Sequence, residues 1–252
     1  LVCCGMQGNI KASNNSQSIS IKMKTLSLLL VATTIVSGAT FAAQTLYKDY
    51  PADVMPELSE SGEFPVGVTT MEVTYPEAAM TMEGKMETRG LTLEVWYPAQ
   101  KATENTLYSD ETRSGQVFEI QADASRDVAI AESESKFPIV VVSHGYTGYR
   151  TLMYYLGEHL ASHGYVVAAI DHTDSTNKDV NFAENPYSGF PSTLLNRSRD
   201  QVFTLNAVTD SEFFNASVDA TKAGVIGYSM GGFGAVSTVG GCYAFNDEAA
   251  AT

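Results

Sequence analysis

The sequence predicts an α/β domain built on a mostly parallel sheet, and three observations lead to this prediction. Short, continuously apolar runs alternate with segments of helical periodicity between residues 138 and 226. Such runs are typical of strands buried on both faces, as parallel strands are. Consecutive strands joined by helices form one sheet with right-handed crossovers. Finally, the glycine-flanked serine motif Gly227-Tyr228-Ser229-Met230-Gly231 directly follows the last apolar run.

The first 43 of the 252 residues are expected to lie outside this domain. Met23-Lys24 precedes an apolar run from Leu26 to Val36, and small residues follow as far as Ala43. A basic start, an apolar stretch of about 7–15 residues and a small-residue region are typical of a secretory signal peptide. An uncleaved anchor is the alternative, but the run is shorter than the ~20 residues that a membrane span needs. The predicted organisation is a non-native upstream extension at 1–22, a signal peptide at 23–43 and an α/β domain at 44–252, in a secreted or periplasmic protein.

Charge and cysteine content restrict the partners and cofactors of the domain. Removal of residues 1–42 takes away three lysines and no acidic residue, which moves the net charge from −14 to −17. Nucleic acid and anionic membranes are not expected as partners, because phosphate binding needs clusters of Lys and Arg. Cys242 is the one cysteine after residue 42, so no internal disulfide is expected. The sequence predicts no metal and no organic cofactor, and it leaves the oligomeric state open.

Two segments before residue 100 have the alternating pattern of half-buried strands. Apolar and polar residues alternate over 71–75 and again over 91–97. We expect these strands to be antiparallel neighbours at an edge of the sheet. The polar residues 44–62, with two prolines, are expected to form an extended lead-in, and the polar residues 100–137 a surface excursion.

Three buried strands and two helices are expected after residue 137. Leucines recur at every fourth position from 152 to 160, which predicts a helix that ends at Gly164. A long polar loop over 173–191 precedes a second helix, with Ser192 as its N-cap and an apolar stripe over 202–208. The three apolar runs that predict the strands are 138–142, 165–170 and 222–226.

The motif around Ser229 is typical of a nucleophile elbow, a tight strand–turn–helix that exposes a serine in a strained conformation. The motif alone is common by chance. Here it lies at a strand–helix junction, about 85 residues after a His144-Gly145 loop that ends another buried strand. The backbone N–H of Met230 and one from the earlier loop, where Tyr146 lies, are the expected donors of an oxyanion hole. A serine hydrolase is therefore predicted, with Ser229 as nucleophile.

Five segments resemble the α/β-hydrolase superfamily, most nearly its platelet-activating-factor acetylhydrolase-like and dienelactone-hydrolase-like esterases. The sequence HGYTG together with LASHGYVVAAID is also similar to bacterial cutinases and polyester hydrolases. The resemblance covers residues 64 to about 245 and implies an α/β-hydrolase fold. It also implies Ser229 as nucleophile and the amides of Tyr146 and Met230 as the oxyanion hole. The five segments are FPVGVTTMEV, LTLEVWYPA, FPIVVVSHGYTGYRTLMYYLGEHLASHGYVVAAIDHTDST, NRSRDQVFTLNAV and VDATKAGVIGYSMGG.

The chain departs from this superfamily in one respect. The superfamily order is nucleophile, acid, histidine, whereas all four histidines precede Ser229. Residues 237–252 are expected to finish the elbow helix and no more. The resemblance therefore implies that the domain is incomplete at its carboxyl side and that the acid and the histidine of the triad lie in sequence beyond Thr252.

The remaining candidate residues receive mostly structural interpretations. His144 is expected to pack within its loop and shape the oxyanion hole, whereas His159 and His163 are expected to face solvent. His172 is the alternative base or a pocket-lining residue, and Asp171 beside it organises its loop or contacts substrate. His144, Asp171 and His172 are thus the possible pocket residues. Asp247 and Glu248 follow the elbow helix too closely to serve as the superfamily's acid.

The function predicted is that of a secreted serine-dependent carboxylic ester hydrolase that forms an acyl-enzyme. Short-chain or phospholipid-type esters are the expected substrates, since the loop over 173–191 is polar and has no apolar lid. A cutinase-like polyester hydrolase is the alternative within the enzyme class. Outside that class, the alternatives are a non-catalytic binding protein of hydrolase fold and an inactive fragment. The intact serine motif argues against the binding protein.

Overall fold

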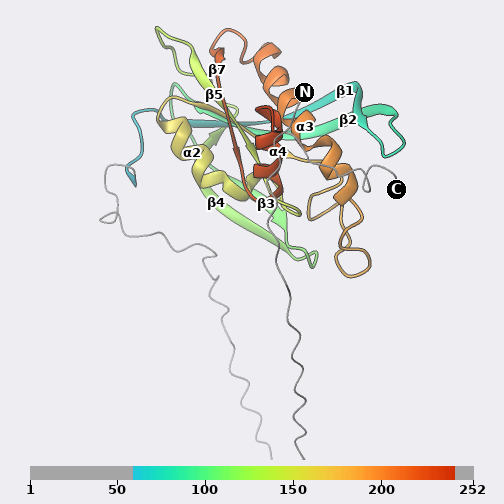
Figure 1. The fold of residues 1–252 in the computed structure, drawn as a ribbon. Helices are drawn as coiled ribbons and strands as arrows, with labels where there is room; N and C mark the ends of the chain where they lie inside the picture. The colour runs from blue at the N-terminus through green and yellow to red at the C-terminus, as the bar shows by residue number, and fades with distance from the viewer. Residues whose placement is uncertain (1–58, 242–252) are drawn as a thin grey trace, which may run out of the picture. The chain divides into compact units, whose positions relative to one another are not determined.

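The computed structural model describes residues 59–241. The upstream extension, the signal-peptide segment, most of the lead-in, Cys242, Asp247 and Glu248 lie outside the described residues. The described strands form one seven-stranded sheet in the order β3-β4-β1-β2-β6-β5-β7 (Figure 1). The strands are β1 (Val66–Met80), β2 (Met86–Pro98), β3 (Asn105–Glu111), β4 (Val117–Arg126), β5 (Phe137–Ser143), β6 (Val166–Asp171) and β7 (Val218–Gly227). The helices are the 3-10 helix η1 (Arg150–Met153) and the α-helices α2 (Tyr154–Ser162), α3 (Phe190–Asp210) and α4 (Met230–Thr238).

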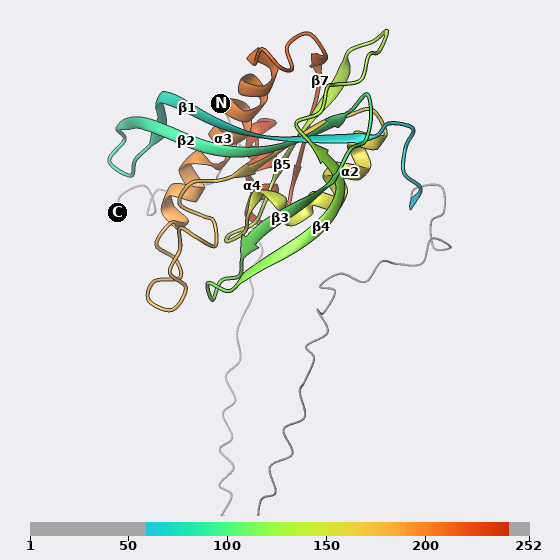
Figure 2. The same ribbon diagram turned by 180° about the vertical axis from the view of Figure 1, so that it is seen from behind.

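The second half of the described chain has the predicted parallel arrangement. Strand β5 pairs in parallel with β6 on one side and with β7 on the other. Helix α2 packs against β2 and β6, while α3 packs on the sheet together with α4 (Figures 1 and 2). Ile139 and Val141 belong to the core that includes Val208 of α3, and Val140 and Val142 to the core that includes Ala161 of α2. Strand β5 is therefore buried on both faces, as its apolar run predicts.

The pair β1–β2 is antiparallel as expected, but the expectation that it forms the sheet edge is wrong. The excursion over 100–137 contains the hairpin β3–β4, and β4 extends the sheet beyond β1 through Gly67 and Val68. The polar composition of β3 concealed it. Its alternate residues Thr106, Tyr108 and Asp110 are buried, so a strand with a polar inner face joins the sheet.

Strand β7 was predicted to be buried, and it is not. It is the outermost strand of the described sheet and pairs only with β5 there. Most of its residues from 220 to 226 are exposed. The apolar run identified a strand correctly, but it carried no information on how many neighbours that strand has.

The helix positions are close to those expected. Helix α2 ends just before Gly164, whose φ of +90° favours glycine. Helix α3 is capped by Gly189 instead of the predicted Ser192, which lies inside the first turn. A Cβ atom at position 189 would lie 1.6 Å from the carbonyl oxygen of Asp174, so only glycine fits at this start. Within residues 59–241, no helix combines the length and apolar character that crossing a membrane requires.

Candidate active site

Ser229 occupies the turn between β7 and α4 with an unusual backbone conformation. Its φ is 52° and its ψ −117°, a region that L-residues other than glycine rarely adopt. Such a conformation costs about 1–3 kcal/mol and persists where the surroundings enforce it. The side chain is exposed at the start of the helix. The turn thus presents the serine hydroxyl to solvent, as the motif predicts.

The glycines of the motif allow the turn to close against the end of β5. A Cβ atom at Gly227 would lie 2.2 Å from the carbonyl carbon of Gly231, and one at Gly231 would lie 2.0 Å from the carbonyl oxygen of Ser143. The backbone N–H of Tyr228 donates to that same Ser143 oxygen at 3.0 Å. A Cβ atom at Gly145 would be 3.0 Å from that of Ser229. The loop after β5 therefore lies in direct contact with the serine turn.

Two backbone N–H groups beside this contact have no acceptor among residues 59–241. One belongs to Met230, the first residue of α4, and the other to Tyr146, which follows Gly145. N–H groups in the first turn of a helix have no intrahelical partner, and the positive end of the helix dipole favours negative charge there. The two expected oxyanion donors are thus unpaired and lie next to residues that touch Ser229.

Tyr146 also connects the loop after β5 to the start of α3. Its hydroxyl accepts a hydrogen bond from the backbone N–H of Gly189 at 3.2 Å. Its ring meets the ring of Phe190 edge-on, with 5.5 Å between the centroids. The polar loop before α3 is therefore tied to the loop that borders Ser229.

No histidine serves as a base for Ser229 in this structure. All four histidines lie within the described range, and none forms a hydrogen bond with the Ser229 hydroxyl, which has no partner among residues 59–241. His163 is exposed as expected, and its Nε2 lies 3.1 Å from the carbonyl oxygen of Glu60. His159 is half-buried against the His163 ring, so its prediction as solvent-facing is only partly correct.

His144 and His172 are buried, with 2% and 1% of their surface exposed. They do not form the wall of an open pocket, contrary to one expectation for them. His144 Nε2 accepts the backbone N–H of His172 at 3.3 Å, and its Nδ1 donates to the carbonyl oxygen of Gly145 at 2.6 Å. Burial holds the pKa of both imidazoles well below the usual 6.5, so both rings are neutral. His144 packs inside its own loop, as predicted.

Asp171 forms an ion pair with Arg150. Its carboxylate accepts hydrogen bonds from the backbone N–H and from the guanidinium of Arg150, both at 2.5 Å. Burial raises the pKa of Asp171, and the Arg150 charge opposes that rise. Arg150 also pairs with the buried Glu94 of β2 at 2.9 Å. Asp171 therefore holds the end of β6 to the start of η1, which agrees with the expectation that it organises its loop.

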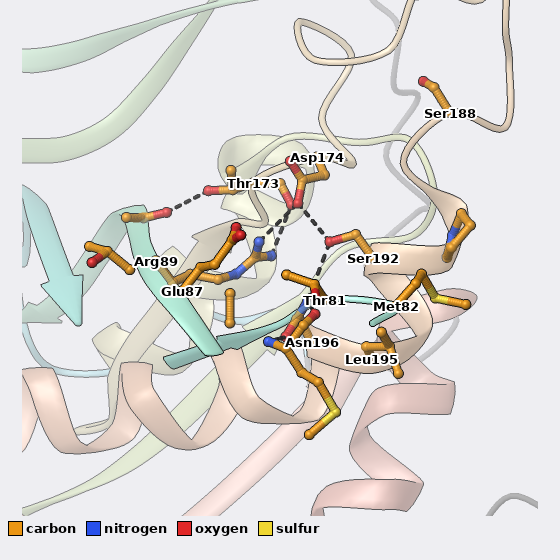
Figure 3. A pocket seen from close by; sticks show the side chains of 15 residues that line it. Thr81, Met82, Glu87, Arg89, Thr173, Asp174, Ser188, Ser192, Leu195 and Asn196 are labelled. Carbon is orange, nitrogen blue, oxygen red and sulfur yellow. Dashed lines mark hydrogen bonds and ion pairs between the residues drawn. The ribbon is translucent and has the colours of Figure 1, made fainter. Parts of the chain in front are cut away.

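A cavity of about 460 Å³ lies near the carboxyl end of β6, between the β1–β2 turn, the loop after β6 and the start of α3 (Figure 3). Arg89 and Ser192 both donate to the Asp174 carboxylate on its wall, at 2.9 and 2.7 Å. Ser229 is not among the residues that line it. Within residues 59–241, no three His, Cys, Asp or Glu side chains are grouped to hold a metal ion.

Comparison with solved structures identifies the fold. A ferulic acid esterase from Streptomyces cinnamoneus superposes with a TM-score of 0.55 at 24% identity, over 72% of this chain and 57% of the esterase. The chain has the α/β-hydrolase fold. The fold class predicted from the sequence is therefore confirmed. The sequence relatives described next confirm the predicted resemblance to hydrolases of this fold.

Sequence comparisons agree with this fold. A family model described as PETase, PET hydrolase-like, matches residues 129–241. The cutinase est1 of Thermobifida alba is 30% identical over 152 residues, which are 54% of this chain and 45% of the cutinase. The bis(hydroxyethyl) terephthalate hydrolase of Streptomyces coelicolor is 33% identical over 102 residues, covering 40% of this chain and 28% of that hydrolase. The canine platelet-activating factor acetylhydrolase is 49% identical over 41 residues, or 16% and 9% of the two chains. The chain thus spans less than half the length of these curated relatives.

The sequence did not point to Arg89 or Asp200, although the structure places both beside the candidate site. Arg89 pairs with Asp200 through two hydrogen bonds of 2.7 and 2.8 Å, and Asp200 accepts a third from His172. Asp200 is one of several polar residues on the buried side of α3, where the 3.6-residue pattern leads one to expect apolar side chains. That violation of the pattern is the one signal that could have indicated a buried polar network.

Proposed function

We propose that this α/β-hydrolase is a serine-dependent carboxylic ester hydrolase with Ser229 as its nucleophile. The observation that carries the proposal is the strained, exposed Ser229 held against Gly145 by the loop after β5. A strained backbone at an exposed serine points to function, because such conformations cluster at active sites and are typical of a nucleophile elbow. Relatives whose names describe ester hydrolases support the same reaction class.

In the proposed reaction the Ser229 Oγ attacks the ester carbonyl carbon. The carbonyl oxygen becomes an oxyanion that the N–H groups of Met230 and Tyr146 stabilise, each worth about 2.7–4 kcal/mol in comparable sites. The tetrahedral intermediate expels the alcohol and leaves an acyl-enzyme, which water hydrolyses. The base that accepts the Ser229 proton is not one of the four histidines. We assign it, with its acid partner, to sequence that follows the elbow helix, as the superfamily order implies.

Two substrate classes fit the site. The polar loop over 173–191 supports short-chain or phospholipid-type esters, since no described apolar segment there covers Ser229. A cutinase-like action on polyesters is the second candidate. It is favoured by the PET hydrolase-like family match and by the exposed ring of Tyr228, 61% accessible, next to the nucleophile. Export of the protein is part of the same proposal and rests on the signal-peptide pattern at 23–43.

A fluorophosphonate probe tests the nucleophile in the full-length protein. The probe needs an activated hydroxyl and an oxyanion hole, so it reports the whole arrangement. We expect stoichiometric labelling and ester turnover in the wild type, and loss of both in Ser229→Ala. Ser188→Ala, an exposed serine of the polar loop at the same sheet edge, is the matched control and should label normally. Labelling that persists in Ser229→Ala would place the nucleophile elsewhere and reject the proposal.

Substrate class is tested separately with the same protein. Rates on p-nitrophenyl esters of increasing acyl length should be highest for short chains. Release of soluble acid from polyester film, with slow turnover of the small esters, would instead support the cutinase-like candidate. A maximum at long acyl chains would contradict both candidates and indicate a lipase.

A further inference from the structure

A second serine–histidine–aspartate arrangement lies behind the proposed nucleophile. The hydroxyl of Ser143, the last residue of β5, is 2.8 Å from Nε2 of His172, and Nδ1 of His172 is 2.8 Å from Oδ2 of Asp200. Because a carboxylate paired with arginine only accepts hydrogen bonds, His172 carries its proton on Nδ1. The Nε2 atom is then an acceptor, and Ser143 donates to it. The order of donors is that of a catalytic triad in its resting state.

Burial excludes this arrangement as a second active site. Ser143 and Asp200 are 0% exposed and His172 is 1% exposed, so no ester can reach the Ser143 hydroxyl. The backbone of Ser143 is also regular strand paired with Ile170 and Gly227 on its two sides. Its role must therefore be exerted through what it holds in place.

The network holds Ser143 in place, and the turn that contains Ser229 packs against the backbone of Ser143. The carbonyl oxygen of Ser143 accepts the Tyr228 N–H, and it lies within 2.0 Å of where a Gly231 Cβ would be. Its neighbour His144 accepts the backbone N–H of His172 through Nε2, so both residues at the end of β5 are bonded to His172. Gly145 and Tyr146, which border Ser229, follow directly.

The far end of the network is anchored on three further elements. Arg89 of β2 donates to both oxygens of Asp200 and to the Asp174 carboxylate after β6, and Ser192 of α3 donates to the same Asp174 oxygen (Figure 3). The guanidinium also donates to the carbonyl oxygen of Thr173 at 2.9 Å. The side-chain nitrogen and oxygen atoms of Ser143, His172, Asp200 and Arg89 all have partners. Such a network fixes one geometry because any displacement leaves a buried group unsatisfied.

We propose that His172 is a positioning residue of the esterase site, which fixes the loop Ser143–Tyr146 so that the Tyr146 N–H meets the oxyanion formed at Ser229. This inference rests on the proposed function and assigns to a histidine outside the catalytic triad a role in transition-state geometry. Displacement of an oxyanion donor by about 1 Å lowers the rate of the chemical step far more than it affects substrate binding. Loss of the Ser143–His172 hydrogen bond should accordingly lower kcat and leave KM nearly unchanged.

Ser143→Ala tests the proposal, because it removes one hydroxyl and leaves the nucleophile and its turn intact. We expect kcat, and the rate of fluorophosphonate labelling, to fall about 10- to 100-fold with KM within about twofold of the wild type. Ser125→Ala is the matched control. Ser125 of β4 is equally buried, with 0% of its surface exposed, and its hydroxyl accepts one hydrogen bond of 2.7 Å from the backbone N–H of Thr103, which the variant loses. Its kcat should stay at the wild-type value. Equal losses in the two variants, or none in Ser143→Ala, would overturn the proposal.

A second measurement determines the protonation of His172 in the wild-type protein. Ring-nitrogen shifts of the wild-type protein labelled with ¹⁵N-histidine should show two imidazoles that carry their proton on Nδ1 and stay neutral from pH 8 to 5.5, namely those of His144 and His172. Comparison with His144→Gln and His172→Gln assigns each signal, and the signal of His172 decides the inference. A proton on Nε2, or protonation within that range, would remove the donor order on which the inference rests. Failure of the proposed function can be told apart from failure of this inference, because ester turnover would then survive in Ser229→Ala. If Ser229→Ala is inactive while Ser143→Ala is unaffected, only the present inference fails.

Discussion

Ser143 and Ser229 end adjacent parallel strands, and their surroundings are opposite. Ser143 closes β5 in regular strand geometry, fully buried, with its hydroxyl bonded to the His172–Asp200 pair. Ser229 follows β7 with a positive φ, exposed, and its hydroxyl has no partner among the described residues. The serine with the triad-like hydrogen bonds is thus unreachable, and the reachable serine, our proposed nucleophile, has the strained backbone.

This difference separates the proposed nucleophile from a buried structural serine. A serine–histidine–aspartate chain is also a good way to satisfy buried polar groups, so its presence alone does not indicate catalysis. Exposure, backbone strain and unpaired N–H groups beside the hydroxyl are properties that a structural serine does not need. The following predictions test each side of the comparison by its effect on stability.

Removal of Asp200 should have the largest effect. Asp200→Ala leaves the buried Arg89 with Asp174 as its one carboxylate partner and the His172 Nδ1–H without an acceptor. Breaking a buried ion pair from one side costs about 3–5 kcal/mol, and urea unfolding should show a loss of that size. The exposed Asp210 of the same helix is the control, and Asp210→Ala should change the unfolding free energy little. Similar values for the two variants would show that the network contributes no stability.

Gly231→Ala tests the contact between the two serine regions. The new Cβ atom would lie 2.0 Å from the Ser143 carbonyl oxygen, so the elbow and β5 must separate. We expect a loss of about 3 kcal/mol in unfolding free energy, together with slower fluorophosphonate labelling. Gly224→Ala in β7 meets only Val140 at 3.9 Å and should be nearly neutral. An undiminished labelling rate in Gly231→Ala would mean that the contact does not position the nucleophile.

Acidification should destabilise the Ser143 side through its two buried histidines. The folded-state pKa of His144 and His172 lies below the unfolded value of about 6.5. Below that pH the unfolded chain binds protons that the folded protein does not, so the unfolding free energy falls, by up to about 1.4 kcal/mol per histidine per pH unit. The carboxyls with raised pKa oppose this trend, namely Glu158, Asp171 and Asp200.

The histidine contribution is therefore measured as a difference between two proteins. From pH 6.5 to 5.5 the unfolding free energy of the wild type should fall more steeply than that of His144→Gln, which has one titrating group fewer. Urea unfolding at three pH values provides both slopes. Equal slopes would contradict the neutral state assigned to the buried imidazole of His144.

Relief of the strain at Ser229 should have the smallest effect and the opposite sign. Ser229→Gly keeps the turn and removes the Cβ atom that disfavours φ of 52°, so the unfolding free energy should rise by about 1 kcal/mol while activity is lost. Ser237→Gly, within the same helix, should instead lose about 0.5–1 kcal/mol. A destabilised Ser229→Gly would show that the conformation of Ser229 is not strained.

Much of the architecture was predictable because local patterns report burial. The runs around 138–142 and 165–170 predicted β5 and β6, and the leucine spacing predicted α2, since side-chain periodicity follows backbone geometry. The polar composition of β3 does not predict the hairpin β3–β4, and the apolar run of β7 predicts more burial than this strand has. In both cases the error concerned neighbours, which depend on residues far away in the sequence.

The sequence by itself determined the strand–turn–helix with its serine, because glycine at 227 and 231 and an apolar run before them specify that turn locally. It also determined the α/β fold class. Only the tertiary structure decided what each histidine does. Whether His172 reaches Ser143, Ser229 or solvent depends on where β5, β6 and α3 bring their ends together. Hydrogen bonds between residues 28 or 29 positions apart leave no periodic trace in a sequence. The buried Asp200 and Arg89 that orient His172 were hidden for the same physical reason: their partners are neighbours in space and not along the chain.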